Sequence, residues 1–549
     1  MRLDQQSRPS FNRSVWRVAA ALLFASGLAL SVSGQTPPAQ NPPPATPAPA
    51  MPPVHESPIA GGMPLSIDDA VKLALENNLG IQQEKLNPQI QAYGVARALG
   101  VFTPALFSNF NRRSSTAPPT DFLSQGVAVA TSGNLATTAG LQQQTKWYGG
   151  SYSVAWDGSR ATSDAPHTSF RPQLGSDLSA IYTQPLLRNF KIDSFREQLL
   201  LSRNSQQVAD IQLQERITQT SRNVRAAYYN LVGAIAGLEV AQQSLDLARQ
   251  SLHDNQRRVE VGTMAPIDIV AAEAEVASND ENVIVAQANI QSAEDQLRAL
   301  VMNPSQPGFW ATIFRPTEQP ALAPRAIDVD AAIANALANR TDIQQLKKQI
   351  ESTDVSMKFA ANQKLPTVDV TGRYGVTGVG GTLYDYIDST TPGAPPIATV
   401  IGTRSFMDAL RDVFGNNYRT WSVAVNVSYP IGTSVADAAY AQGKIQREQE
   451  NTQLENLKLQ VATAVREAGR GVNTNLKRVE ATRRARELAE KRLEAEQKRF
   501  TVGLSTTFEL FQAQRDLSRA RQAELTATID YNRSLVDFEA VQASPIGGR

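Results

Sequence analysis

One uninterrupted stretch decides the fold. It runs from Ala436 to Val502 and reads ADAAYAQGKIQREQENTQLENLKLQVATAVREAGRGVNTNLKRVEATRRARELAEKRLEAEQKRFTV. It contains no proline, and apolar residues such as Leu454, Leu457 and Val461 recur at steps of three or four, which predicts one amphipathic helix. Such a helix of roughly 67 residues is about 100 Å long. A helix of this length cannot fold back into a compact domain, so it requires partner helices alongside it.

The second half of this stretch is densely charged, with acids four positions before bases, as in the pairs Glu480–Arg484 and Glu487–Lys491. The two signs alternate, which indicates a solvated helix face rather than a nucleic-acid-binding surface. The whole chain carries 53 Lys and Arg against 52 Asp and Glu, a net charge of +1. This balance gives no electrostatic reason to expect nucleic acid as a partner.

The long helix has a twin. Residues 193–261 are also free of proline and of similar length, and both stretches end in a Val-Gly tip, at Gly262 and Gly503. An acidic residue lies six positions after each glycine: Asp268 in the first copy and Glu509 in the second. We expect shorter helices to return over residues 266–302 and 506–542, because glycine at the end of one helix followed by proline or threonine at the start of the next is typical of a tight αα-hairpin.

The repeat extends to the beginning of each half. The segments Leu65–Asn77 and Ile327–Asn339 resemble one another, and Pro104 and Pro366 then precede strand-like sequence. Before the repeats, Arg13 and Arg17 precede an apolar run, which is typical of a secretory signal. We therefore expect the following organisation: signal peptide 1–34, proline-rich leader 35–64, first repeat 65–302, linker 303–326, second repeat 327–542 and C-terminal tail 543–549. The chain has no cysteine, which excludes a disulfide framework and a thiol nucleophile.

After each of the two prolines the apolar period changes from 3.6 to 2. Residues 421–429 (WSVAVNVSY) are the cleanest example, and residues 368–374, 152–156 and 178–184 alternate in a similar way. Taken alone, such strands fit half-buried soluble β-structure. In an exported chain, between very long helices and with aromatic residues at their ends, they fit transmembrane β-strands. We expect the polar segments 114–145 and 377–419 to be loops outside the cell.

The number of strands limits the oligomeric state. Two strands per half give roughly four per chain, or six if residues 145–160 form an additional hairpin, whereas the smallest single-chain bacterial barrels have about eight strands. Lipid tolerates no open sheet edge, so the chain is expected to close its barrel with copies of itself. The sequence thus predicts a homo-oligomer in contact with outer-membrane lipid.

The duplicated plan resembles the TolC-like outer-membrane efflux and secretion channels. The resemblance covers about residues 65–542. It rests on the repeated openings, the two prolines, the segment Gln184-Pro-Leu-Leu-Arg188 and the Val-Gly tips with their acids. It implies a fold that is mainly α with membrane β, in which duplicated long α-helical hairpins form a periplasmic tunnel and the strands contribute to a shared transmembrane β-barrel. It further implies a homotrimer with a twelve-stranded barrel, a periplasmic adaptor and an inner-membrane pump as partners, and no cofactor.

The same resemblance assigns candidate functional residues. The constriction of such channels lies at the hairpin tips, which implies a gate at Asp268 and Glu509. Two positions depart from the family pattern, since Gln512 stands where a second aspartate is common and Ser505 where an arginine occurs. The implied adaptor-docking residues are the two tips: Val261, Gly262, Thr263, Val502, Gly503 and Leu504.

The acids also have a purely structural interpretation. Thr506 and Glu509 have the spacing of a capping box, and Asp268 falls in the first turn after Pro266, where an acid stabilises the helix start. The two interpretations are compatible.

Other function classes fit less well. The three histidines, His55, His167 and His253, are too scattered for a metal site or a base–nucleophile pair. The main alternative is a periplasmic coiled-coil structural or adaptor protein whose strands form soluble domains. We predict a passive outer-membrane exit duct of a tripartite efflux or type I secretion system, and not an enzyme.

Overall fold

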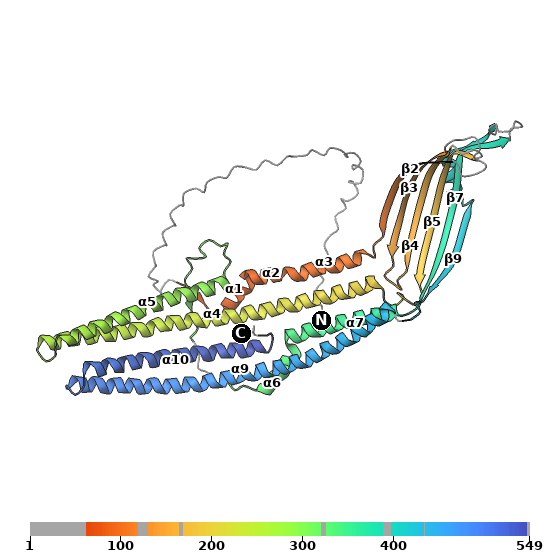
Figure 1. Cartoon of the computed structure of the whole chain (residues 1–549). Helices are drawn as coiled ribbons and strands as arrows, with labels where there is room; N and C mark the ends of the chain where they lie inside the picture. Colours follow the sequence, from red (N-terminus) through yellow and green to blue (C-terminus); the bar gives the residue numbers. More distant parts are fainter. Residues whose placement is uncertain are drawn as a thin grey trace, which may run out of the picture. The chain divides into compact units, whose positions relative to one another are not determined.

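The computed structural model describes residues 62–118, 130–163, 168–319, 325–387, 397–432 and 434–545. The predicted signal peptide and almost all of the leader lie outside the described residues. Two long helical hairpins and one β-sheet dominate the described part (Figure 1). None of its helices combines the length and the apolar character needed to span a membrane.

The two hairpins confirm the predicted duplication. In the first, α4 (Ser194–Glu260) is followed by α5 (Ile267–Val301); in the second, α9 (Val435–Thr501) is followed by α10 (Thr507–Val541). The side chains of Asp193 and Ser434 cap the starts of the two 67-residue helices, α4 and α9. Contacts between α5 and α4, α4 and α10, and α10 and α9 arrange the four helices side by side in that order.

Shorter helices extend this layer towards the sheet. The first half contributes α1 (Ile67–Asn77), α2 (Leu79–Glu84) and α3 (Leu86–Gly100), and the second half contributes α6 (Val329–Asn339) and α7 (Thr341–Gln363). The first half has a break between α2 and α3, where Pro88 lies in the opening turn of α3, whereas α7 continues without interruption. Near the sheet the helices contact one another in the order α3, α4, α7, α9.

The sheet lies at the end of these helices that is distant from the hairpin tips (Figure 1). Its antiparallel neighbours follow the order β2 (Ala105–Ala117), β3 (Ala130–Gln144), β4 (Ser151–Ser163), β5 (Phe170–Pro185), β7 (Thr367–Ile387), and the near half of β7 then pairs with β9 (Arg419–Ser428). The distal half of β7 pairs with β8 (Ile397–Arg404) instead. The short helix α8 (Phe406–Phe414) links β8 to β9 and packs on β5 and β7.

The sheet corrects three sequence-based expectations. The predicted loop 114–145 contains β3, and the predicted loop 377–419 contains the end of β7, together with β8 and α8. Residues 145–160 are not a separate hairpin; residues 145–150 are the turn between β3 and β4. The chain therefore offers six strand positions, the higher of the two expected numbers, although the additional hairpin is not at residues 145–160. The twelve-stranded trimeric barrel implied by the resemblance requires four.

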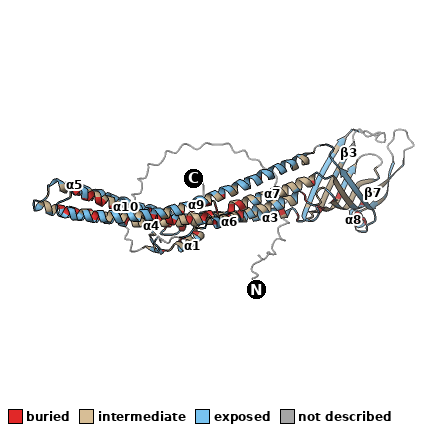
Figure 2. Cartoon of the chain, turned by 90° about the horizontal axis from the view of Figure 1, so that it is seen from below, coloured by how far each residue is buried: buried red, intermediate tan, exposed pale blue. Residues whose placement is uncertain are grey.

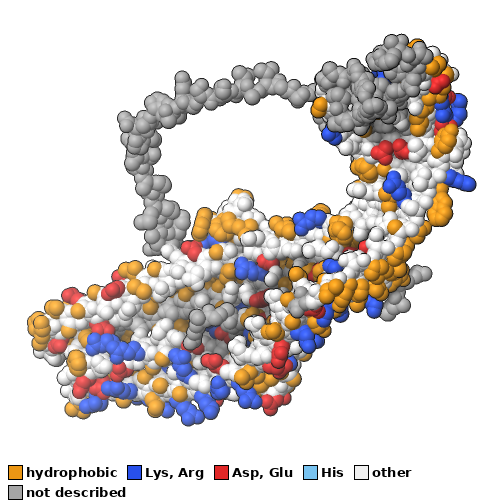
Figure 3. Space-filling view, turned by 45° about the vertical axis from the view of Figure 1, so that its right-hand side comes forward, with side chains coloured by type: hydrophobic (Ala, Val, Ile, Leu, Met, Phe, Trp, Pro, Cys, Tyr) orange, Lys and Arg blue, Asp and Glu red, His pale blue; other side chains and the backbone are white. Residues whose placement is uncertain are grey.

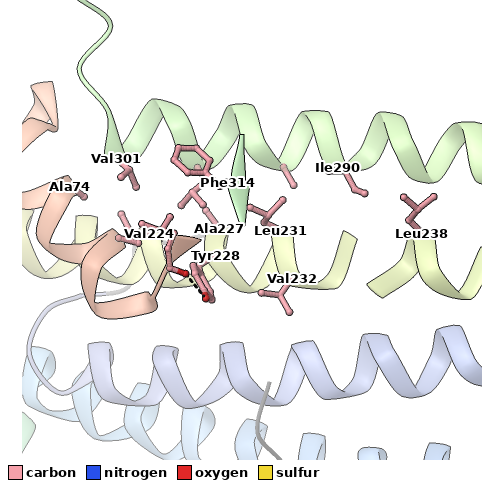
Figure 4. Packing of buried hydrophobic residues seen from close by; sticks show 14 of the residues in the cluster. Ala74, Val224, Ala227, Tyr228, Leu231, Val232, Leu238, Ile290, Val301 and Phe314 are labelled. Atoms are coloured by element: carbon pink, nitrogen blue, oxygen red, sulfur yellow. Dashed lines mark hydrogen bonds between the residues drawn. The ribbon is translucent and has the colours of Figure 1, made fainter. Parts of the chain in front are cut away.

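The largest buried cluster lies between the two helices of the first hairpin, α4 and α5, and the beginning of the first repeat (Figures 2 and 4). Tyr228 of α4, fully buried, donates a hydrogen bond from its hydroxyl to the carbonyl of Leu65 at 3.0 Å and accepts one from the N–H of Glu318 at 3.2 Å. These bonds tie together β1 (Met63–Leu65) and the linker strand β6 (Phe314–Pro316), which pair in parallel. One residue of the linker, Phe314, is buried in this cluster.

The contribution of the Tyr228 hydroxyl to the free energy of unfolding can be measured separately from that of its ring. Tyr228→Phe leaves the ring in place but removes the acceptor of the Glu318 N–H, while the Leu65 carbonyl keeps the hydrogen bond from the Thr317 N–H at 3.1 Å, so we expect a loss of about 0.5–1.5 kcal/mol. Thermal unfolding of the detergent-solubilised protein measures it, and Tyr229→Phe, a half-buried neighbour, is the matched control. An unchanged midpoint for Tyr228→Phe would show that the hydroxyl is dispensable for this junction.

Candidate functional site

The two hairpin tips have the same backbone geometry. Gly262 and Gly503 both have φ of +78°, in the left-handed region that favours glycine. At the first tip, the N–H of Gly262 bonds to the Val259 carbonyl at 2.9 Å and the N–H of Thr263 to the Arg258 carbonyl at 2.8 Å. This pair of bonds defines a Schellman motif, in which the glycine is the residue that ends the helix.

The second tip repeats this motif. The N–H of Gly503 bonds to the Phe500 carbonyl at 3.2 Å, and the N–H of Leu504 bonds to the Arg499 carbonyl at 2.8 Å. Apart from each glycine and its two chain neighbours, no heavy atom of the described residues lies within 4 Å of the position that a Cβ would take at either glycine. The tips are therefore open to solvent on the side that the glycines face.

Apolar side chains are exposed at both tips. Val261 is 78% exposed at the first tip, and Val502 and Leu504 are 69% and 70% exposed at the second. Ile267 and Phe508, at the starts of the two return helices, are similarly exposed. Single exposed apolar residues are ordinary, but a group of five at one end of a long helical layer is typical of an interaction surface.

Glu509 caps the start of α10, as the sequence spacing predicted. Its N–H bonds to the Thr506 hydroxyl at 3.3 Å, and its carboxylate accepts the N–H of Thr506 at 3.2 Å, which completes a capping box. The Ser505 hydroxyl donates to the same carboxylate at 2.9 Å. The Ser505 hydroxyl, followed by the Thr506 N–H, holds the pKa of Glu509 below its ordinary value.

Asp268 has a different role, because it joins the two hairpins. The Thr507 hydroxyl, on the second hairpin, donates to its carboxylate at 2.8 Å. Its own helix α5 begins after Pro266 without a side-chain cap. Gln512, the fourth candidate, donates from its side-chain amide to Asp516 at 3.0 Å. The structure thus places all four candidate gate residues near the tips, and it connects Asp268, Ser505 and Glu509 with neighbouring groups.

A contact that the sequence did not reveal also joins the tips. The guanidinium of Arg258 donates to the Phe500 carbonyl at 3.1 Å and lies 4.5 Å from the centre of the Phe500 ring. Phe500 is buried there, in a cluster with Leu510 and Met264 that unites both hairpins. Arg258 and Arg499 precede their glycines by four residues, so the repeat made Arg258 visible, but only the packing of the hairpins identifies Phe500 as its partner.

The sheet forms a second functional surface. Along β9, Trp421, Val423, Val425 and Val427 are all at least 60% exposed and point to the same face, and Tyr429, directly after the strand, is also 60% exposed. Pairing across the sheet places further apolar residues on this face, among them Tyr374, Tyr182, Val154, Leu106 and Phe110. Hydrophobic side chains gather where the helices meet the sheet (Figure 3). A soluble domain would bury such a face, whereas a lipid bilayer stabilises it when it is exposed.

The opposite face of the sheet is polar. Asp157 and Asp177 lie opposite one another on β4 and β5, and they accept hydrogen bonds at 2.5 Å from the hydroxyls of Thr138 and Thr377. Charged groups at this depth are incompatible with lipid contact, so this face belongs to an aqueous interior. The alternation of apolar and polar faces is that of a membrane β-barrel wall.

Comparison with known proteins decides the family. The family model described as outer membrane efflux protein matches residues 151–301 and 332–541, which together make up more than half of the chain. The chain belongs to the outer membrane efflux protein family. The Outer membrane protein TolC of Escherichia coli is 25% identical over 312 residues, which span 56% of this chain and 58% of that relative. As a member of this family, the chain is an outer-membrane protein with a helical periplasmic part, as the sequence predicted.

Solved structures show the same fold. One match is a crystal structure of CusC, whose description refers to transmembrane channel formation. Its TM-score is 0.61 at 13% identity, and the match covers 87% of this chain and 92% of the CusC chain. The CmeC outer membrane channel of Campylobacter jejuni matches with a TM-score of 0.60 and 14% identity, over 87% and 85% of the two chains. At this identity the matches show the shared architecture, not a shared substrate.

The Glu509 cap makes the second tip sensitive to pH. Because the folded pKa of Glu509 lies below its ordinary value of 4.5, the ionised carboxylate stabilises the tip at higher pH, and this stabilisation is lost as the pH falls through the lowered pKa. Hydrogen–deuterium exchange, corrected for intrinsic rates, should show residues 505–510 losing protection on acidification. In the Glu509→Gln variant, the protection of these residues should change little as the pH falls. The uncapped start of α5 is the internal control, and an equal pH response at both starts would contradict this role.

Proposed function

We propose that this efflux protein is the passive exit duct of a tripartite efflux or type I secretion system, and that it works as a homotrimer. One observation carries the proposal. A sheet with an exposed apolar face lies at one end of helices 67 residues long, and in the described part of the chain its strands β2 and β9 each have one side without a partner strand, so the chain is one segment of a wall that other copies complete. Helices of about 100 Å extend far beyond a hydrocarbon core of about 30 Å.

The helical layer supports assembly independently of the sheet. Its outermost members are α5 and α9, and both carry exposed apolar residues. On α5, Ile284 and Val285 are 60% and 53% exposed, and on α9, Leu459 and Leu488 are 67% and 66% exposed. In a closed ring, α5 of one copy lies beside α9 of the next and covers these residues. The same rotation axis then closes the sheet and the helical layer together.

The tips form the gate and the docking surface of the proposed duct. Rotation about a three-fold axis multiplies each carboxylate into a ring, so Glu509 and Asp268 would present two acidic rings close to the narrowest passage. Acidic rings concentrate cations and repel anions. Ser505 and Gln512 contribute no charge there, so the contacts Arg258–Phe500 and Asp268–Thr507 are the candidate latch between hairpins.

The proposed partners supply the energy for export. A periplasmic adaptor would bind the exposed apolar tips, around Val261–Thr263 and Val502–Leu504, and would connect them to an inner-membrane pump. The tips are the first part of the outer-membrane protein that a periplasmic partner meets, since they lie at the far end of the helices from the sheet (Figure 1).

Charging the tips should uncouple the duct from its adaptor. Val261→Asp with Leu504→Asp places carboxylates in a surface that the adaptor would dehydrate, and an unpaired carboxylate there costs more than the ~1.4 kcal/mol of a ten-fold loss in affinity. We expect adaptor co-purification and export to be lost while the oligomer remains in the membrane. Val261→Asn with Leu504→Asn is the matched control, because asparagine has the shape of aspartate without its charge, and we expect it to weaken docking less. Unaltered export by the charged variant would remove the docking role.

Neutralising the acids should change ion selectivity. In planar bilayers under a salt gradient, we expect the wild-type pore to conduct weakly and to prefer cations, and Glu509→Gln with Asp268→Asn to shift the reversal potential towards zero. Gln512→Glu, which adds a carboxylate near the same level, should shift it in the opposite direction. A double variant with the wild-type reversal potential and a destabilised tip would show that these acids act only as helix caps and hairpin contacts.

A further inference from the structure

Six strands of the sheet lie next to the four helices that end near it. The strands are β2, β3, β4, β5, β7 and β9, and the helices are α3, α4, α7 and α9. Four strand ends connect directly to helices: α3 leads into β2, β5 into α4, α7 into β7, and β9 into α9. The remaining two strands, β3 and β4, are joined to one another by residues 145–150 and have no helix of their own. They are inserted between β2 and β5, although α3 and α4 below them are in contact.

The turn between β3 and β4 is fixed to the top of the helical layer. The Tyr148 ring stacks on Phe190 with centroids 4.8 Å apart, and the Gln184 side chain donates to the Tyr148 carbonyl at 2.7 Å. Gly149, with φ of +67°, leaves no room for a Cβ, which would lie 2.4 Å from the Asn189 carbonyl oxygen if it were present. The inserted hairpin is therefore an integral part of the wall, anchored just before α4 begins.

The widths of the sheet and the helical layer match. Six strands about 4.8 Å apart and tilted by about 40° occupy roughly 38 Å of a circumference. Four helices packed about 9 Å apart occupy roughly 36 Å. Four strands at the same tilt would occupy only roughly 25 Å. With β3 and β4 included, a barrel of ordinary tilt sits on a helical tunnel of equal width.

We propose that three copies of this chain close an eighteen-stranded barrel, in which β2 of one copy pairs with β9 of the next. The proposal rests on the trimer of the proposed function and departs from the twelve strands that the family resemblance implies. In the described part of the chain, β3 is the only partner of β2 and β7 the only partner of β9. Since β2 runs away from the helices and β9 runs back towards them, the new pair is antiparallel, like every other pair in the sheet.

The register of this pair is narrowly defined. The ten residues of β9 must lie fully against the thirteen of β2, and the apolar face must continue across the junction. Only two registers meet both conditions: Phe110 lies opposite Val423 in one and opposite Val425 in the other. Either register covers the exposed backbone groups of both edges, which lipid would otherwise leave without hydrogen bonds.

An eighteen-stranded barrel also changes the lumen. Barrel diameter grows roughly linearly with strand number, and barrels of about 16–18 strands enclose an aqueous channel. Its inner wall would carry the polar row that crosses four strands, Thr138, Asp157, Asp177 and Thr377, in each copy. The barrel would therefore not be the narrow part of the duct, and the constriction would lie at the helical tips.

Engineered cysteines test the pairing directly, because the chain has none of its own. In otherwise wild-type full-length protein in membranes, one of two double variants, Phe110→Cys with Val423→Cys or Phe110→Cys with Val425→Cys, should yield covalent dimers and trimers on mild oxidation. Phe110→Cys with Thr137→Cys is the matched control, since these residues are opposite within the chain and should cross-link without changing its mass.

A further pair distinguishes eighteen strands from twelve. Phe110 and Ser176 lie three strand spacings apart, about 14 Å, so Phe110→Cys with Ser176→Cys should not cross-link. A within-chain Phe110–Ser176 disulfide would mean that β2 contacts β5 and would overturn the proposal, as would twelve strands in an electron cryomicroscopy map of a three-chain complex. A complex with another number of chains would overturn the proposed trimer instead, so the two failures are distinguishable.

Discussion

A sheet edge in hydrocarbon has no water to satisfy its backbone N–H and C=O groups, and this constraint governs the molecule. The exposed apolar face of β9 fits contact with lipid, while in the described part of the chain β2 and β9 each have a partner strand on one side only. In the proposed assembly, identical copies close these edges. The same arrangement would cover the open sides of α5 and α9 and would bring the tips together around one axis.

The duplication explains how one chain presents similar elements twice around that axis. Each half provides a strand-to-helix connection, a helix of 67 residues, a Schellman tip and a return helix of 35 residues. The halves differ where function would concentrate. The first tip has no capping box but contributes Asp268 to Thr507 of the second tip, and the second tip carries the capped Glu509. The first half also contains the inserted β3–β4 hairpin, so the two halves contribute unequally to the sheet.

The sequence predicted the helices well because their signals are long and periodic. The predicted helices 436–502 and 266–302 differ from α9 and α5 by one residue at each end, and the Thr506–Glu509 spacing predicted the observed capping box. It failed at β3. The strand reads ATSGNLATTAGLQQQ, and its lipid-side positions include Thr137 and Ala139, which are too small to produce an apolar alternation. The linker residue Trp310 is 75% exposed, while Phe309 beside it is buried.

The Arg258–Phe500 contact was beyond the reach of sequence for a different reason. Both residues are visible in the repeat, but they meet only because α4 packs against α10, and no local period encodes that arrangement. The same holds for Asp268 and Thr507. Sequence thus identified which residues lie at the tips, whereas the partners of these residues depend on packing between segments more than 200 positions apart.

If the chain is one segment of a closed wall, it must associate with copies of itself. Native mass spectrometry of the mature protein, released from detergent micelles, measures the number of chains directly. We expect a single species of three chains that retains its β-structure by circular dichroism. A monomer that keeps the same β-signal in detergent would contradict it, because six strands with two open edges would then be stable without a neighbour.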